Sequence, residues 1–241
     1  MTDNDAAPQL DPTTIDFESA YRTGALVEGL VLERMPWDIG EPQPLLMKIE
    51  EQGHISGDVL DVGCGPGDNA AYLAERGYRV TGLDAAPTAI EQARARAAAR
   101  GAQVEFAVAD ATVLSGYDNR FDTVISSSLM HCLDPEQRKG YVAALHRVMR
   151  PGARLIQFCF PDDPDGRNRT FSPYPITEAE LRAAFSAPKW TITTLRADRI
   201  TAIAPPEPML QAFREQGVEP DRDDSGAMLL PTWVLEATRN G

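Results

Sequence analysis

Five short apolar runs alternate with helical patterns between residues 58 and 160, and this alternation constrains the fold more than any other feature of the sequence. The runs are rich in Val, Ile, Leu and Phe and read GDVLDVG, YRVTGLD, QVEFAVAD, FDTVISSS and ARLIQFCF. Segments 68–76, 87–100 and 135–150 have the composition and start residues of helices. Strands that alternate with helices of this length form right-handed βαβ units. The sequence therefore predicts an α/β fold with a doubly wound, mostly parallel sheet.

Two regions accompany this core pattern. Residues 1–52 precede the first strand, and we expect them to form a helical N-terminal cap over the site. Residues 53–241 form the core, with an insertion near 200–226 that we expect to act as a lid and that contains a short helix at 207–215. The other elements expected late in the core are a helix over 177–186 with Thr177 as its N-cap and strands over 191–200 and 232–240.

Composition narrows the ligand class. The net charge of −13 opposes binding to nucleic-acid phosphates and to anionic membrane surfaces. No apolar run approaches the roughly 18 residues of a membrane span, and the acidic start lacks the apolar core of a signal peptide. Cys64, Cys132 and Cys159 fit neither a zinc spacing nor a disulfide framework. We therefore expect a cytoplasmic protein with reduced thiols, a small-molecule partner and no metal; the sequence leaves its oligomeric state open.

A glycine-rich string, Asp61-Val-Gly63-Cys64-Gly65-Pro-Gly67, follows the first predicted strand. Glycine has no Cβ, so the chain can turn sharply and approach a ligand closely, and the next helix offers free N–H groups. The string alone is also compatible with a tight turn that binds nothing. Its G-x-G-x-G spacing differs from the G-x-G-x-x-G of dinucleotide sites, which disfavours a dinucleotide-dependent oxidoreductase but leaves it as an alternative.

Two further carboxylates end the second and third predicted strands, Asp84 in TGLD and Asp110 in AVAD. The carboxyl ends of parallel strands meet at one edge of the sheet, where such folds bind ligands. Asp84 can accept from both hydroxyls of a ribose, and Asp110 with Ala111 can meet an adenine. Each Asp alone is more often a helix N-cap. Three acids at successive strand ends beside the glycine string instead favour an adenosyl ligand that carries an ammonium group.

Residues 58–160 as a whole resemble the class I S-adenosylmethionine (SAM)-dependent methyltransferases. Asp61 to Gly67 match the first motif, Asp84 the ribose acid and Asp110 the adenine acid. Asp122 matches the start of the fourth strand, and Arg150-Pro151-Gly152 the turn before the fifth. The resemblance implies a seven-stranded sheet in the order 3-2-1-4-5-7-6 with an antiparallel last strand. It also implies SAM as cofactor, with S-adenosylhomocysteine as its product.

A second resemblance concerns the substrate. Residues 35–44, with Trp37, resemble the segment before the first motif in thiopurine and thiol/halide methyltransferases, and the whole chain is similar to the heterocyclic toxin methyltransferases. The resemblance implies methyl transfer to O, or to N or S, of a small heteroaromatic compound such as a hydroxyquinolone, in a detoxifying role. Thiol or thiopurine S-methylation is the alternative. Trp37 either anchors the N-terminal arm or packs on the sulfonium.

Methyl transfer depends mainly on alignment, which supplies roughly 7–11 kcal/mol of the barrier, and a base adds about 10²–10⁴ in rate only where the acceptor is still protonated. His131 is the candidate base, with Tyr21 as a second catalytic candidate. The alternative for His131 is a structural role in the cavity wall without any part in the chemistry. The expected cofactor contacts are Trp37, Asp61, Gly63, Cys64, Gly65, Gly67, Asp84, Ala85, Asp110, Ala111 and Ser126. The expected substrate contacts are Phe17, Tyr21, Met130, His131, Phe160, Met209 and Phe213.

Overall fold

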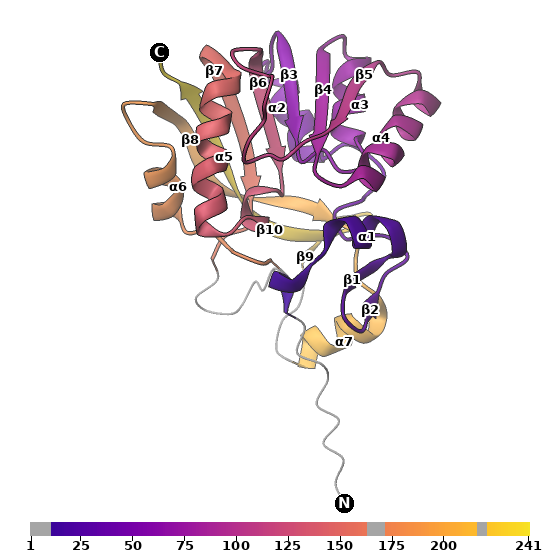
Figure 1. Cartoon of the computed structure of the whole chain (residues 1–241). Helices are drawn as coiled ribbons and strands as arrows, with labels where there is room; N and C mark the ends of the chain where they lie inside the picture. The colour runs from indigo at the N-terminus through magenta and orange to yellow at the C-terminus, as the bar shows by residue number, and fades with distance from the viewer. Residues whose placement is uncertain (1–10, 163–171, 216–220) are drawn as a thin grey trace, which may run out of the picture.

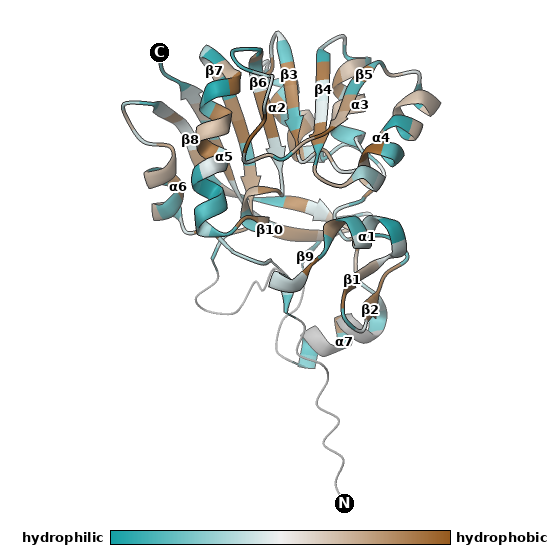
Figure 2. Cartoon of the chain, in the orientation of Figure 1, coloured by the Kyte–Doolittle hydropathy of each residue, from teal (hydrophilic) through white to brown (hydrophobic). Residues whose placement is uncertain are grey.

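The computed structural model describes residues 11–162, 172–215 and 221–241, without the side chains of residues 208, 209, 212 and 213. A central sheet lies between two layers of helices, and a smaller N-terminal arm lies against one edge of the sheet (Figure 1). Brown, the colour of hydrophobic residues, runs along parts of the central strands, and teal, the colour of hydrophilic residues, is prominent on the helices outside them (Figure 2). This arrangement is the expected α/β fold, because strands covered on both faces are apolar throughout.

The sheet has a mixed order. From one edge to the other its strands are β5 (Val104–Val108), β4 (Arg79–Asp84), β3 (Asp58–Val62), β6 (Phe121–Ser127), β7 (Met149–Cys159), β10 (Met228–Arg239) and β8 (Trp190–Ala202). The first five are parallel, whereas β10 is antiparallel to both β7 and β8. Numbered from β3, this is the order 3-2-1-4-5-7-6 that the resemblance implied. A short additional strand, β9 (Asp221–Arg222), pairs with β10.

The helices divide between the two faces. One face packs against α2 (Pro44–Glu51), α3 (Asp68–Glu75) and α4 (Pro87–Arg100). The other packs against α5 (Pro135–Val148) and α6 (Glu178–Ala184). All five residues of β3 are buried because helices cover it on both sides. None of the helices in the described ranges is long and apolar enough to cross a membrane.

Local signals set several helix ends. Thr177 begins α6 with a capping box: its hydroxyl accepts from the N–H of Glu180 at 3.1 Å, while its own N–H donates to the Glu180 carboxylate at 2.7 Å. This confirms Thr177 as the predicted N-cap. Asp134 forms the same kind of box at the start of α5. The predicted helix over 207–215 is present as α7 (Glu207–Glu215).

The N-terminal arm, residues 11–43, differs from the expected helical cap. After α1 (Phe17–Thr23) it forms a hairpin of β1 (Ala25–Val27) and β2 (Leu30–Val31). The turn needs a left-handed residue, which Gly29 supplies at φ 80°. The arm has its own small core of Ala20, Leu26, Leu32 and Met35. The described part of the expected helical cap therefore contains a β-hairpin as well as helix α1.

The fifth parallel strand begins earlier than the sequence predicted. The expected Pro-Gly turn lies inside β7, where the register passes from Phe121 opposite Met149 to Thr123 opposite Arg154. Residues 150–153 therefore bulge from the ladder, and Gly152 takes the left-handed conformation that the bulge requires, at φ 82°.

Candidate active site

A cavity of about 500 Å³ opens at the carboxyl ends of the parallel strands. The glycine loop after β3 and the ends of β4, β5 and β6 form its floor, and the N-terminal arm covers it. In Figure 1 the arm lies beneath this edge of the sheet, and β8 and β10 curve under the sheet towards it. The volume is typical of a site for a small molecule.

The glycine loop is bent so that no side chain fills the floor. Gly63, Gly65 and Gly67 all line the cavity with positive φ angles of 71°, 52° and 82°. A Cβ on Gly65 would lie 2.9 Å from the Tyr21 hydroxyl. A Cβ on Gly67 would lie 2.8 Å from both a methyl of Ala93 and the ring of Phe106, in the packed core. Side chains are therefore excluded here by backbone conformation and by space.

Two of the predicted carboxylates line the cavity. Asp84 accepts from the N–H groups of Gly65 and Ala86, each at 2.9 Å, and so holds the end of β4 to the glycine loop. Burial raises its pKa, and the hydrogen bonds from these N–H groups oppose that rise. Asp110 accepts from the N–H and hydroxyl of Thr112 at 2.8 and 2.7 Å. Cys64, Ala85 and Ala111, three other predicted cofactor contacts, also line the cavity.

The third carboxylate, Asp61, lies beneath the loop rather than on the cavity wall. Its side chain is 1% exposed, and neither carboxyl oxygen has a hydrogen-bond partner among the described residues. Burial, and then the charge of Asp84, raise the pKa of Asp61 to about 7. The backbone of Ala70 opposes this rise only in part, so the buried carboxyl remains costly to ionise.

Aromatic residues of the arm face the floor. The Trp37 indole N–H donates to the Tyr21 hydroxyl at 2.9 Å, and the rings of Phe17 and Trp37 lie 5.7 Å apart. Burial, and then the charge of Asp84, raise the pKa of Tyr21 well above its ordinary value. Its hydroxyl therefore stays protonated at neutral pH, and it is not a base. All three rings line the cavity, as the sequence predicted.

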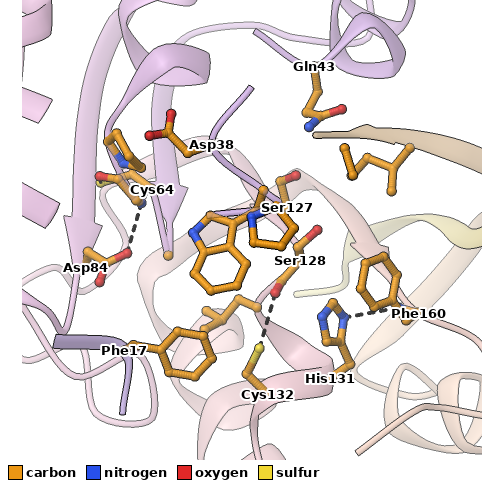
Figure 3. A pocket seen from close by; sticks show the side chains of 18 of the residues that line it. Phe17, Asp38, Gln43, Cys64, Asp84, Ser127, Ser128, His131, Cys132 and Phe160 are labelled. Atoms are coloured by element: carbon orange, nitrogen blue, oxygen red, sulfur yellow. Dashed lines mark hydrogen bonds between the residues drawn. The ribbon is translucent and has the colours of Figure 1, made fainter. Parts of the chain in front are cut away.

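His131 lies in a 3₁₀ turn, Met130–Cys132, and stacks on Phe160 with ring centres 4.1 Å apart. Figure 3 places this stack on the side of the cavity opposite Phe17 and Asp84. The His131 Nδ1 accepts from the backbone N–H of Phe160 at 3.1 Å, so a neutral ring carries its proton on Nε2. Burial lowers the pKa of His131 to about 3. These observations argue against the predicted general base and favour the wall residue that was its alternative.

Besides Asp61, two predicted contacts are placed away from the cavity wall, and two fall outside the description. Ser126 is fully buried off the cavity, whereas Ser127, on the opposite face of β6, lines it. Ser128 also lines the cavity, just beyond the end of the strand. Met130 is 1% exposed and packs in the core beside α5. Neither of these two side chains contacts the cavity as predicted. The side chains of Met209 and Phe213 lie outside the described residues.

Sequence reasoning missed the residue that joins the arm to the far end of the sheet. Gln43 donates to the carbonyl of Thr201 at 3.0 Å and accepts from its N–H at 3.2 Å. Its own N–H donates to Asn69 at 2.9 Å. A side chain that mimics a strand partner across 158 residues leaves no local pattern in the sequence. The other lining residues that were missed include Ile39, Leu129, Cys132 and Gln137.

Known proteins are similar to this chain in both sequence and fold. A family model described as a methyltransferase domain matches residues 59–152. A 2-heptyl-1-hydroxyquinolin-4(1H)-one methyltransferase of Mycobacteroides abscessus is 42% identical over 234 residues, which span 93% of this chain and 96% of that protein. The chain belongs to the SAM-dependent methyltransferases. The alternative of a dinucleotide-dependent oxidoreductase therefore falls away.

Solved structures resemble this methyltransferase as well. One, from work on the conversion of a disulfide bond into a thioacetal group during echinomycin biosynthesis, is 34% identical with a TM-score of 0.75 and covers 93% of this chain and 91% of its own. Another is the 1,6-didemethyltoxoflavin-N1-methyltransferase of Burkholderia thailandensis with bound 1,6-didemethyltoxoflavin and S-adenosylhomocysteine. It is 25% identical with a TM-score of 0.55, over 82% of this chain and 77% of its own.

The cofactor is SAM, and the floor of the cavity fits it. The bend at Gly63–Gly67 leaves room that a Cβ would fill. Asp61 is an uncompensated carboxyl under that bend, which suits an ammonium group. Asp84 and Asp110 place acceptors at the ends of β4 and β5. A phosphate-bearing ligand would meet carboxylates instead of cations at these positions.

Proposed function

We propose that this methyltransferase methylates an oxygen of a small heteroaromatic compound of the hydroxyquinolone type. The observation that carries the proposal is the 42% identity, along nearly the whole of both chains, to a methyltransferase named for a hydroxyquinolone. The toxoflavin methyltransferase adds a second heteroaromatic substrate on the same fold. A detoxifying role is part of the proposal, as is a cytoplasmic location, which the free thiols of Cys64, Cys132 and Cys159 support.

In this proposal the floor of the cavity binds the cofactor. We assign Asp84 to the ribose hydroxyls, Asp110 and Ala111 to the adenine, and Asp61 with the loop Gly63–Gly67 to the amino-acid end. SAM supplies a methyl group on a positively charged sulfur. The carboxylates and the excluded side chains hold that group in place, and alignment of this kind is the main contribution that a protein makes to such a transfer.

The acceptor ring is proposed to lie between the arm and the stacked pair of His131 and Phe160. Phe17 faces this pair across the cavity (Figure 3), and Trp37 also lines the cavity, so the walls include flat apolar rings. The neutral His131 ring is a hydrogen-bond donor through Nε2. A planar bicyclic ring suits such walls because aromatic faces pack well in offset stacks.

The residues near this wall are poor proton acceptors, so we propose that the acceptor reacts as an anion. The pKa of His131 is lowered to about 3, and burial raises the pKa of the Cys132 thiol to about 12. Tyr21 also keeps its proton. An N-hydroxyquinolone loses its proton readily in water, whereas a simple phenol does not. Selectivity for acidic acceptors then follows from the site itself.

The test is a panel of hydroxyquinolones, phenols and thiols incubated with methyl-labelled SAM, with mass spectrometry of the products. We expect O-methylated hydroxyquinolone as the main product and a kcat/KM that rises with pH up to the pKa of each acceptor. Transfer to phenols as fast as to hydroxyquinolones would contradict the anion proposal. Absence of any methylated hydroxyquinolone would overturn the substrate class.

Sulfur methylation is a second candidate. The structural neighbour from echinomycin biosynthesis is 34% identical over most of both chains and belongs to work on sulfur chemistry. A thiol also ionises near neutral pH, so a site without a base serves it equally well. In the same panel, products confined to the thiols would favour this candidate over the first.

A further inference from the structure

Aliphatic side chains line the cavity in addition to the aromatic residues. On the sheet side these are two cross-strand pairs, Ala202 with Met228 and Ile200 with Leu230, in the register of β8 and β10. Residues directly opposite each other in antiparallel strands point to the same face, so the four side chains form one continuous patch. Ile200, Ala202 and Met228 are buried, and Leu230 is half-buried.

The N-terminal arm supplies the opposite wall. Leu26 of β1, Leu32 and Pro36 line the same cavity, and the two leucines are 2% and 6% exposed. The two walls are fixed to each other, because the N–H of Ile203 donates to the carbonyl of Pro36 at 2.8 Å. The paired hydrogen bonds between Gln43 and Thr201 hold the next turn of the arm. This space is therefore built into the fold.

The chemistry of these walls selects what fills them. None of the seven side chains named carries a charge or a hydrogen-bonding group, so a polar ligand would lose its water there without compensation. None is aromatic, in contrast to the rings around His131. Asp221, which also lines the cavity, is exposed and accepts a hydrogen bond from Arg199 at 3.1 Å. Its charge is therefore already paired with a guanidinium. A saturated hydrocarbon chain fits such walls best.

We propose that this aliphatic pocket, formed by Ile200, Ala202, Met228 and Leu230 against Leu26, Leu32 and Pro36, binds an alkyl chain carried by the acceptor ring. The inference rests on the proposed function, since it assumes a ring held by the aromatic walls. It makes the length of the chain a determinant of specificity. The ring is recognised by one half of the acceptor site, and its hydrocarbon substituent by the other.

The experiment uses 1-hydroxyquinolin-4-ones that carry methyl, propyl, pentyl, heptyl or nonyl groups at C2, with methyl transfer measured from labelled SAM. Each methylene that enters the pocket is expected to lower KM about fourfold, which is the value of one CH₂ group removed from water. The gain stops once the chain fills the pocket. We expect kcat to change much less, because the chain is remote from the reacting atoms.

A matched pair of variants locates the effect. Ala202→Phe adds a ring to the pocket, whereas Ala197→Phe adds the same ring on the exposed side of the same strand. Ala202→Phe is expected to lower kcat/KM for the heptyl compound at least tenfold more than for the methyl compound. Ala197→Phe should lower both equally or not at all. SAM affinity, measured by calorimetry, shows that each variant is folded.

Leu230→Asn is the second variant, because it makes the same wall polar without added volume and so remains informative if Ala202→Phe does not fold. In this variant, each added methylene should lower KM by a smaller factor than in the wild type. A KM that is independent of chain length, or a Leu230→Asn variant with an unchanged gain per methylene, would overturn the alkyl pocket while leaving the proposed function intact. No transfer to any member of the series would instead refute the proposed function.

Discussion

At the scale of single residues, Asp84 has two tasks that one carboxylate can perform together. It accepts the N–H groups of Gly65 and Ala86, which fixes the loop, and it presents its charge to the cavity. Hydrogen bonds to charged groups contribute about 1.5–3 kcal/mol each. Their number at Asp84 makes this residue a sensitive point for cofactor binding.

We predict that Asp84→Ala weakens SAM binding at least a hundredfold and leaves the fold intact, because the hydrogen bonds that we assign to the ribose hydroxyls are charge-assisted. Calorimetric titration with SAM measures the affinity, and circular dichroism reports the fold. Glu91→Gln, on the exposed face of α4, is the control and should bind SAM normally. Unchanged affinity in Asp84→Ala would remove the ribose assignment.

His131 makes a prediction about acid stability. Its pKa is about 3 in the folded protein and 6.5 as a free side chain, so below pH 6.5 only the unfolded chain takes up the proton. The free energy of unfolding should therefore fall as pH drops from 6.5 towards 3, by up to about 1.4 kcal/mol per pH unit from this residue. His131→Gln should flatten this dependence in urea unfolding at pH 7, 6, 5 and 4. Parallel curves for the two proteins would contradict a neutral buried ring.

At the scale of elements, the arm is held to the core by Arg96 of α4. Its guanidinium binds the two Asp38 oxygens at 2.6 and 2.8 Å, and also Asp68 at 2.6 Å. The hydrogen bonds to Asp38 raise the pKa of Arg96, and burial opposes this rise only in part. The guanidinium therefore stays charged at neutral pH. Glu18 adds a second tie, accepting from the N–H and hydroxyl of Thr88 at 3.0 and 2.6 Å.

We predict that Asp38→Asn loosens the arm more than it weakens the core. Amide hydrogen exchange should increase over residues 11–43, and KM for the acceptor should rise because the arm lines the cavity in which we propose that the acceptor binds. Asp118→Asn is the matched control, since Asp118 pairs with Arg147 at an exposed surface where ion pairs contribute little. If exchange rose equally across β3 and β6, the ion pair of Arg96 with Asp38 would stabilise the whole fold and would not specifically hold the arm.

The elements also show how far a sequence can be interpreted. The strands β3 to β7 were predictable because strands covered on both sides are apolar along their length. The carboxylates at their ends followed from topology. Ser126 was mistaken for a lining residue because the run Ile125–Ser128 shows no alternation that would set its phase. The hairpin at Ala25–Val31 had a signal, Glu28-Gly29 between apolar pairs, that was overlooked.

The aliphatic pocket that we propose for the acceptor could not be predicted from the sequence, for a different reason. Ile200 meets Leu230, and Ala202 meets Met228, only after the register of β8 and β10 is known. The insertion between the two strands conceals that register, since no turn of defined length connects them. Pairing across such a distance depends on the packed sheet and not on local sequence.

At the scale of the whole molecule, the buried Asp61 links stability to pH and to the cofactor. Its pKa is about 7 in the folded protein against 3.8 for the free side chain, so the folded state holds its proton more tightly. The stabilising contribution is full below pH 3.8 and is lost as pH rises through 7. A cation placed beside the carboxylate would offset this loss.

We predict that the melting temperature of the wild type falls more between pH 5 and pH 8 than that of Asp61→Asn. Differential scanning calorimetry over this range measures both proteins, and the difference between them isolates Asp61 from the general effect of the net charge of −13. Saturating SAM should reduce the difference, because it supplies the missing cation. A pH-independent difference would mean that Asp61 is ionised throughout.

The hydrogen bonds that join residues 36 and 43 to residues 203 and 201 connect the N-terminal arm to β8, a strand that is made much later than the arm. On the ribosome, the strands that cradle the cofactor are complete well before β8 and β10 emerge. The part of the cavity assigned to the nucleoside therefore forms first during synthesis. The part proposed for the acceptor forms only after β8 and β10, which provide one of its walls.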